Sequence, residues 1–199
     1  HTSYQSPPCG LIGFAQHETI LTRNKSKFTI EAGMYFSAVG PVSLCGGQGI
    51  IMEFKLYKPQ FTIGGPVEAA GRLKYIDGCT DSLLLPPVKF GDPCFNALYF
   101  PPNINQTQHT HPSLRVGLVV SGRGECVTPN KITPLKPDTA FVIEANGPHY
   151  FRTFADQGMV VVAYHPDSDF GPKDENHPMI NRTIVDGVSA ALIDQIRTQ

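Results

Sequence analysis

The sequence is poor in charge, lacks tryptophan and contains no long apolar run. Charged residues make up 17% of its 199 positions, below the ~25% that is usual for soluble globular chains. The formal net charge of −1 leaves no strongly basic surface of the kind that attracts nucleic acids and anionic membranes. No apolar stretch approaches the ~18–20 residues that cross a bilayer. We therefore expect neither a nucleic-acid partner nor a membrane partner.

Cysteine is present without any pairing pattern. The five cysteines are odd in number, scattered, and contain no C-x-x-C pair. This predicts reduced thiols rather than a disulfide framework. No charged-then-apolar leader is visible either. Together these features lead us to expect a cytoplasmic protein.

Glycine and proline are abundant, at 19 and 18 residues, and they separate short runs of β-forming residues. Many short strands with turn signals between them are typical of an all-β sandwich or barrel. The predicted strands are Phe28–Ile30, Met34–Val39, Gly49–Tyr57, Arg72–Ile76, Phe95–Phe100, Leu114–Val120, Gly124–Thr128, Ala140–Ile143, Tyr150–Phe154 and Met159–Tyr164.

Three regions follow from this pattern. Residues 1–27 are polar with a Pro-Pro pair, and we expect an N-terminal arm there. Residues 28–165 are predicted to form the barrel together with an N-terminal strand extension. The sequence leaves open whether the extra strands extend one barrel or build a degenerate second one. Residues 166–199 are predicted to be a polar loop and a short C-terminal helix that packs on the barrel.

The helix prediction rests on periodicity. Val188, Ala191, Leu192 and Ile196 recur at the i, i+3, i+4 and i+8 spacing of one helical face. Asp186 precedes them at a position that suits an N-cap.

The strongest chemical signal is a pair of histidines one residue apart, His109 and His111, which open the apolar stretch 114–120. Side chains alternate along a strand, so both imidazoles would lie on one face. A third histidine from a neighbouring strand would complete a facial set of nitrogen ligands with open positions for a substrate or O2. The alternative interpretation is a pair of structural or surface histidines.

Two segments resemble the signatures of the cupin superfamily. His109-x-His111, with Gly122 eleven residues later, resembles the first signature, and Glu144-Ala-Asn-Gly-Pro-His149 resembles the second. The resemblance covers roughly residues 90–165. It implies a double-stranded β-helix, or jelly roll, and a metal site inside it. It also implies a homodimer, since cupins commonly pair.

The main departure from the family pattern is Arg115, which stands where cupins carry a glutamate ligand. A guanidinium stays protonated and cannot bind a cation. The implied metal ligands are therefore His109, His111 and His149, a three-histidine set that resembles cysteine dioxygenase-type cupins. Iron(II) is the metal that this resemblance favours. Three imidazoles also suit zinc, nickel or copper, and manganese stays an alternative.

Arg115 has the same strand parity as the two histidines and should face the same interior. A buried cation beside a metal is costly unless an anion neutralises it. We expect Arg115 to bind a substrate carboxylate or phosphate; the alternative is a structural pair with Glu144 or Glu125. Tyr99 and Tyr150 are candidate phenols for acid–base work, or else aromatics that fill the barrel wall.

These expectations define a metal-dependent enzyme that acts on a small anionic organic substrate. The resemblance favours an iron(II) dioxygenase. A metal-assisted isomerase or lyase is the first alternative, with the metal as a Lewis acid. A non-catalytic cupin that binds a small ligand is the second.

Overall fold

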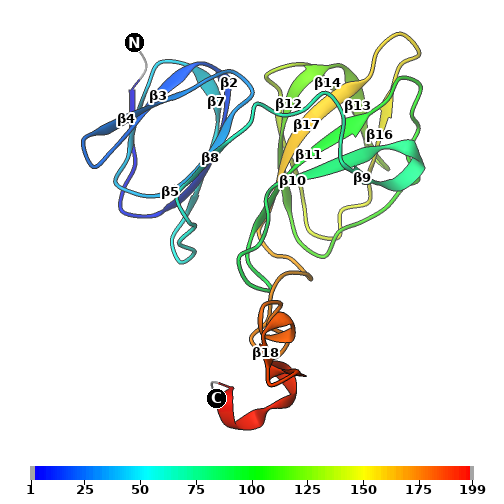
Figure 1. Ribbon diagram of the computed structural model, residues 1–199. Coiled ribbons are helices and arrows are strands. Elements are labelled where there is room, and N and C mark those ends of the chain that lie inside the picture. The colour runs from blue at the N-terminus through cyan, green and yellow to red at the C-terminus, as the bar shows by residue number, and fades with distance from the viewer. Residues whose placement is uncertain (1–2, 198–199) are drawn as a thin grey trace.

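The protein consists of two β-barrels followed by an extended C-terminal segment (Figure 1). The computed structural model describes residues 3–197. All of its strand pairings are antiparallel. No helix in this part of the chain is long and apolar enough to cross a membrane. The expected all-β jelly-roll architecture is confirmed.

The first barrel is built from two four-stranded sheets, with orders β1-β6-β3-β4 and β7-β2-β5-β8. Its strands are β1 Ser3–Gln5, β2 Gly10–His17, β3 Thr19–Arg23, β4 Ser26–Ile30, β5 Tyr35–Val39, β6 Ser43–Cys45, β7 Gln48–Phe54 and β8 Thr62–Gly64.

The second barrel has a six-stranded sheet, β15-β12-β17-β11-β10-β9, and a three-stranded sheet, β14-β13-β16. Its strands are β9 Leu73–Lys74, β10 Thr80–Leu85, β11 Cys94–Phe100, β12 Arg115–Gly122, β13 Gly124–Thr128, β14 Lys131–Leu135, β15 Ala140–Ile143, β16 Tyr150–Thr153 and β17 Met159–His165. A short 3-10 turn, η1 Ile76–Gly78, lies between β9 and β10.

The expected N-terminal arm at residues 1–27 is wrong for the part of it that the structure describes. β2 lies inside its sheet between β7 and β5, and Leu11, Ile12 and Phe14 are buried. Both faces of β2 are covered, one by the first barrel's interior and the other by the second barrel. A strand buried on both faces does not alternate between apolar and polar residues. The period-two pattern of a strand with one solvent-exposed face is therefore absent from β2. The extra strands thus form a barrel of their own.

The two barrels repeat one topology. β2, β3, β4, β5, β6 and β7 pair with one another as β12, β13, β14, β15, β16 and β17 do. One close contact recurs as well. A Cβ on Gly13 would lie 2.3 Å from the Phe36 ring, and one on Gly117 would lie 2.2 Å from the Phe141 ring. Because glycine has no side chain, the phenylalanine ring of the neighbouring strand can lie directly against the backbone at both positions.

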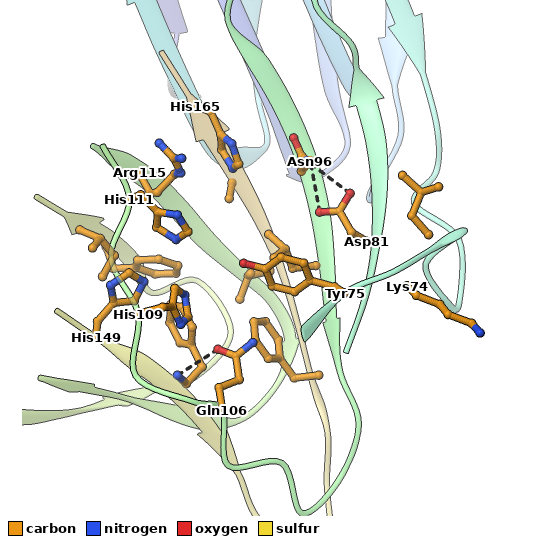
Figure 2. A pocket seen from close by; sticks show the side chains of 18 residues that line it. Lys74, Tyr75, Asp81, Asn96, Gln106, His109, His111, Arg115, His149 and His165 are labelled. Carbon is orange, nitrogen blue, oxygen red and sulfur yellow. Dashed lines mark hydrogen bonds between the residues drawn. The ribbon is translucent and has the colours of Figure 1, made fainter. Parts of the chain in front are cut away.

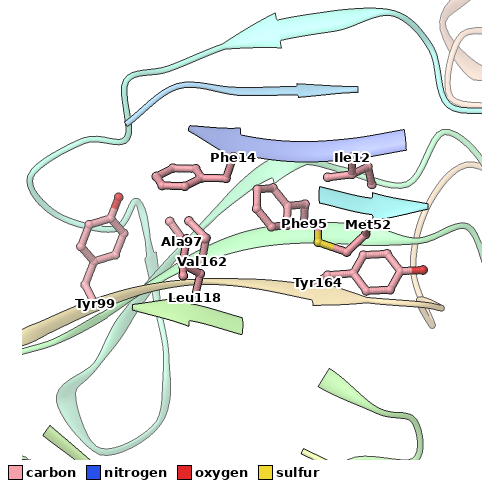
Figure 3. Close-up of a cluster of buried hydrophobic side chains, with 9 residues drawn as sticks. All are labelled: Ile12, Phe14, Met52, Phe95, Ala97, Tyr99, Leu118, Val162 and Tyr164. Atoms are coloured by element: carbon pink, nitrogen blue, oxygen red, sulfur yellow. The ribbon is translucent and has the colours of Figure 1, made fainter. Parts of the chain in front are cut away.

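A shared apolar core joins the barrels. Ile12, Phe14 and Met52 of the first barrel pack on residues from β11, β12 and β17 of the second (Figure 3). The Gln16 side chain also donates a hydrogen bond to the Val120 carbonyl across this boundary, at 2.6 Å. The six-stranded sheet is therefore covered by the first barrel on its outer face and encloses the second barrel's interior with its inner face.

The C-terminal segment projects away from both barrels (Figure 1). It contains η2 Ile180–Arg182, the hairpin of β18 Ile184–Val185 and β19 Val188–Ser189, and two 3-10 turns, η3 Ala190–Leu192 and η4 Asp194–Ile196. The expected helix that packs on the barrel is wrong. Asp186 has a φ of 48° in the hairpin turn rather than at an N-cap, and Leu192 is 78% exposed.

Candidate metal centre

The three histidines are held together by backbone hydrogen bonds at one end of the second barrel. His109 and His149 exchange both of their N–H to O bonds, at 2.9 and 3.0 Å, and Asn146 N–H donates to the His111 carbonyl at 2.7 Å. His109 and His111 lie in the connection between β11 and β12, not on a regular strand as expected. The isolated bridge between His109 and His149, together with the hydrogen bond from Asn146 to His111, holds the three residues beside one another.

The rings converge on one point. Their centroids lie 4.6 to 5.2 Å apart, and one ligand atom from each lies within 4.8 Å of the others. His109 Nδ1 lies 2.8 Å from the Thr107 carbonyl, and His149 Nδ1 lies 2.9 Å from the Gly147 carbonyl. A carbonyl only accepts, so Nδ1 carries the proton and Nε2 keeps its lone pair. This orientation of a histidine through its other nitrogen is characteristic of metal ligands, and the donor set fits a divalent transition metal.

Burial keeps His111 and His149 neutral. It lowers the pKa of His111 to about 4, with Arg115 and His149 acting in the same direction. Burial likewise lowers the pKa of His149, although the Gly147 carbonyl opposes the shift. Neutral imidazoles present lone pairs at neutral pH without first losing a proton.

The first barrel has no equivalent centre. Ser6 N–H donates to the Val42 carbonyl at 2.9 Å, the counterpart of the backbone contact between His109 and His149. Serine and valine thus occupy two of the corresponding positions. Across residues 3–197, His109, His111 and His149 form the one group of three metal-ligating side chains.

The histidines open onto a cavity of about 280 Å³ inside the second barrel (Figure 2). Aromatic and aliphatic side chains from both sheets form much of its wall, including Leu98, Phe100, Phe141, Ile143, Phe151 and Val161. With a liquid water taking ~30 Å³, the space holds a molecule of a few carbon atoms. Polar groups in such a wall fix the orientation of a ligand.

Arg115 lines this cavity, as its parity predicted. Its Nη1 donates to the Ser113 carbonyl, the Ser113 hydroxyl and the Leu114 carbonyl at 2.7 to 3.1 Å. Its Nε is buried and has no partner among the described residues. Neither expected acid pairs with it, since Glu125 binds Arg152 and Glu144 is exposed.

Charge around Arg115 is only partly balanced. Burial lowers the pKa of the guanidinium, and the nearby carboxylates of Asp167 and Asp169 oppose that shift. Asp167 accepts a hydrogen bond from Ser113 rather than from the guanidinium itself, at 2.5 Å. Within residues 3–197 no salt bridge includes Arg115. The guanidinium therefore keeps donors for an incoming anion.

The two candidate tyrosines lie outside the cavity wall. Tyr99 is buried in the core between the barrels (Figure 3). Tyr150 is adjacent to His149 and Phe151, and since both of these line the cavity, alternation turns Tyr150 to the other face.

Other polar residues take the places that the tyrosines were expected to fill. They are Tyr75, Asp81, Asn96, Gln106 and His165. The pKa of His165 is lowered to about 3, mainly by burial and further by the electrostatic effects of Arg115 and His111. These residues carry no motif. The strand pairing of β10, β11 and β17 brings Asp81, Asn96 and His165 to the cavity, whereas Tyr75 and Gln106 lie in the connections before η1 and after β11.

Comparison with known proteins supports the geometry. Residues 98–165 match the family model of the cupin domain. The second barrel is a cupin domain. The matched segment contains all three histidines and Arg115.

Solved structures resemble a larger part of the chain than the cupin domain alone. A putative glyoxylate-induced protein from Pseudomonas aeruginosa is 15% identical, with 85% of this chain and 70% of that one covered at a TM-score of 0.63. A cupin 2 conserved barrel domain protein from Leptotrichia buccalis is 14% identical, with 82% and 77% covered at 0.59. The protein Ylba from E. coli is 16% identical, with 87% and 73% covered at 0.58. At such identities the likeness concerns the fold. No curated protein matches the sequence.

Proposed function

We propose that the cupin domain is a metal-dependent enzyme acting on a small anionic organic molecule. His109, His111 and His149 would hold the metal, with iron(II) favoured, and Arg115 would bind the anionic group of the substrate. The observation that carries this proposal is a guanidinium whose Nε has no partner within residues 3–197, in the same small cavity as three converging imidazoles.

The roles of the protein groups follow from their contacts. A metal on three nitrogen ligands retains coordination positions at which it polarises a substrate oxygen or, when it is iron, takes part in O2 chemistry. Arg115 would hold a carboxylate by charge-assisted hydrogen bonds. The apolar wall excludes water, which strengthens each electrostatic contact inside. O2-dependent oxidation is the reaction that we favour.

A second candidate is a metal-assisted isomerase or lyase. The observation in its favour is that Tyr75 and Asp81, two groups able to move protons, lie in the same cavity. Burial raises the pKa of Tyr75, with Asp81 adding to the shift and Arg115 opposing it. Such an enzyme needs no O2, and this separates the two candidates.

The test combines metal analysis with O2 uptake. Protein purified without added metal should contain about one transition metal per chain, and a panel of small carboxylates, with and without thiols, should stimulate O2 consumption. Arg115→Met should raise the KM severalfold for the active compound, whereas Arg123→Met, a surface arginine paired with Asp156, should not. Turnover without O2 consumption would favour the isomerase or lyase. Protein that binds no metal even after reconstitution would overturn the proposal.

A further inference from the structure

A buried carboxylate lines the same cavity on the side away from the histidines. Asp81 of β10 is 9% exposed, and Figure 2 shows the Tyr75 ring between it and the three imidazoles. Burial raises the pKa of Asp81, although the Asn96 amide favours its charged form. Neither the metal centre nor the anion-binding role of Arg115 requires an acid at this position.

The hydrogen bonds of Asp81 leave it short of donors. Asn96 Nδ2 lies 3.0 Å from each carboxylate oxygen, and the Cys94 thiol donates to Asn96 Oδ1 at 2.8 Å. A carboxylate offers about four acceptor positions, and this single amide nitrogen serves both oxygens. In the described part of the chain no cationic side chain forms a salt bridge with Asp81. Lys74 also borders the cavity, but Figure 2 shows its ammonium pointing away.

Asp81 and Arg115 place opposite charges in two different parts of the cavity wall. β10 and β12 are separated in the six-stranded sheet by β11 and β17. Three strand spacings of about 4.8 Å separate the two strands by roughly 14 Å. The register adds an offset along the strands, since Asp81 is level with Leu98 whereas Val116, next to Arg115, is level with Phe95. Both side chains reach into the cavity, so the gap between their charged groups is shorter. A small molecule with polar groups at both ends spans it.

We propose that Asp81 binds a protonated amino group, so that the substrate is a small dipolar amino-carboxylate. Its anionic end would lie on Arg115 and its cationic end on Asp81. An ammonium supplies three donors and the missing positive charge, which offsets the cost of a buried carboxylate better than a hydroxyl does. This inference rests on the proposed function in one respect, the binding of the anionic end by Arg115.

The test measures the affinity of simple probes for the metal-loaded full chain. The probes are ω-amino carboxylates of three to six carbons, with the unsubstituted monocarboxylates and the dicarboxylates of equal length, measured by calorimetric titration. At the best length, the amino-carboxylate should bind at least tenfold more tightly than the monocarboxylate. Asp81→Asn, which keeps the side-chain shape, should remove that preference and leave monocarboxylate binding unchanged. Asp156→Asn, a matched change at an exposed carboxylate paired with Arg123, should retain it.

Each outcome is decisive. Monocarboxylate binding that is lost in Arg115→Met, without any preference for an amine in the wild type, overturns this inference and leaves the proposed function standing. A preference that survives in Asp81→Asn overturns it as well. If no carboxylate binds the metal-loaded protein, both this inference and the anion-binding role of Arg115 fail. Monocarboxylate binding by Asp81→Asn shows that the variant is folded, and the wild-type comparison does not depend on any variant.

Discussion

Replacing His149 with alanine is the most direct test of the metal centre. His149 is 1% exposed, its Nδ1 binds the Gly147 carbonyl, and its ring packs against Phe151. In the metal-free protein the substitution loses a hydrogen bond of about 1 kcal/mol together with packing. With metal present it also loses the stabilisation from binding, which is about 2.7 kcal/mol when the metal is at a hundredfold excess over its Kd.

The two losses can be measured separately. For a chain of this length 1 kcal/mol shifts Tm by roughly 2–4 °C, so 2.7 kcal/mol corresponds to a metal-induced rise of roughly 5–11 °C in the wild type. His149→Ala should show no rise, whereas His17→Ala, at an exposed histidine of the first barrel, should show the full rise. The assay is thermal unfolding with and without iron(II) under nitrogen, repeated with zinc, alongside elemental analysis. A His149→Ala protein that keeps one metal per chain and the wild-type rise would refute the assigned ligand set.

Three further results follow from the structure. The pKa of Asp81 is raised in the folded chain, so the folded state loses stability as pH rises from the pKa of the unfolded chain, near 3.8, through the pKa of the folded chain. Asp81→Asn should flatten this loss of stability in metal-free chemical unfolding from pH 3.5 to 7. An unchanged dependence of stability on pH would contradict the raised pKa. Gly117→Ala and Gly13→Ala should each lower the free energy of unfolding by about 1–3 kcal/mol, because an aromatic ring must move. Only Gly117→Ala should weaken carboxylate binding, since its aromatic neighbour lines the cavity. Equal losses of binding in the two variants would argue against the cavity as the binding site. Phe14→Ala should cost about 3–5 kcal/mol in urea unfolding because its ring is buried between the barrels, whereas Leu56→Ala, at a side chain 94% exposed, should cost almost nothing.

The sequence was a good guide to the cupin domain because its site is assembled from local signals. The connection that carries His109 and His111, and the tight turn before His149, are each recognisable from a few adjacent residues. Arg115 could also be placed in the cavity, since it begins the strand that follows. His109 and His111 nevertheless do not lie on a regular strand as expected, since His109 is held by its bridge to His149 and His111 by the hydrogen bond from Asn146 N–H.

The sequence failed where burial comes from distant parts of the chain. An arm was expected over residues 1–27 because of their polar character and their Pro-Pro pair. Ile12 and Phe14 of β2 are nevertheless buried, because a second barrel covers the face that solvent would otherwise reach. Asp81 could not be singled out because its place in the cavity depends on a partner fifteen positions away, Asn96, and on the register between β10 and β11. The helical spacing of apolar residues near the C-terminus predicted a helix that residues 188–196 do not form. This segment projects away from both barrels, so neither barrel offers it a packed surface that would stabilise a helix.

The repeat of one topology separates the requirements of the fold from those of the site. Both barrels keep the same strand pairing and the same glycine beneath a phenylalanine ring, at Gly13 and Gly117. Those features therefore serve the barrel in both halves of the chain, and Gly117 affects the cavity only through the Phe141 ring that lies over it. The positions that differ are the ones at the site, where Ser6 and Val42 in the first barrel correspond to His109 and His149 in the second. The first barrel instead contributes the apolar surface that covers β11, β12 and β17, and these strands present Arg115, Asn96 and His165 to the cavity on their other face. A change in the core between the barrels should thus reach the cavity through the six-stranded sheet of the second barrel, because one face of that sheet contacts the core and the other lines the cavity.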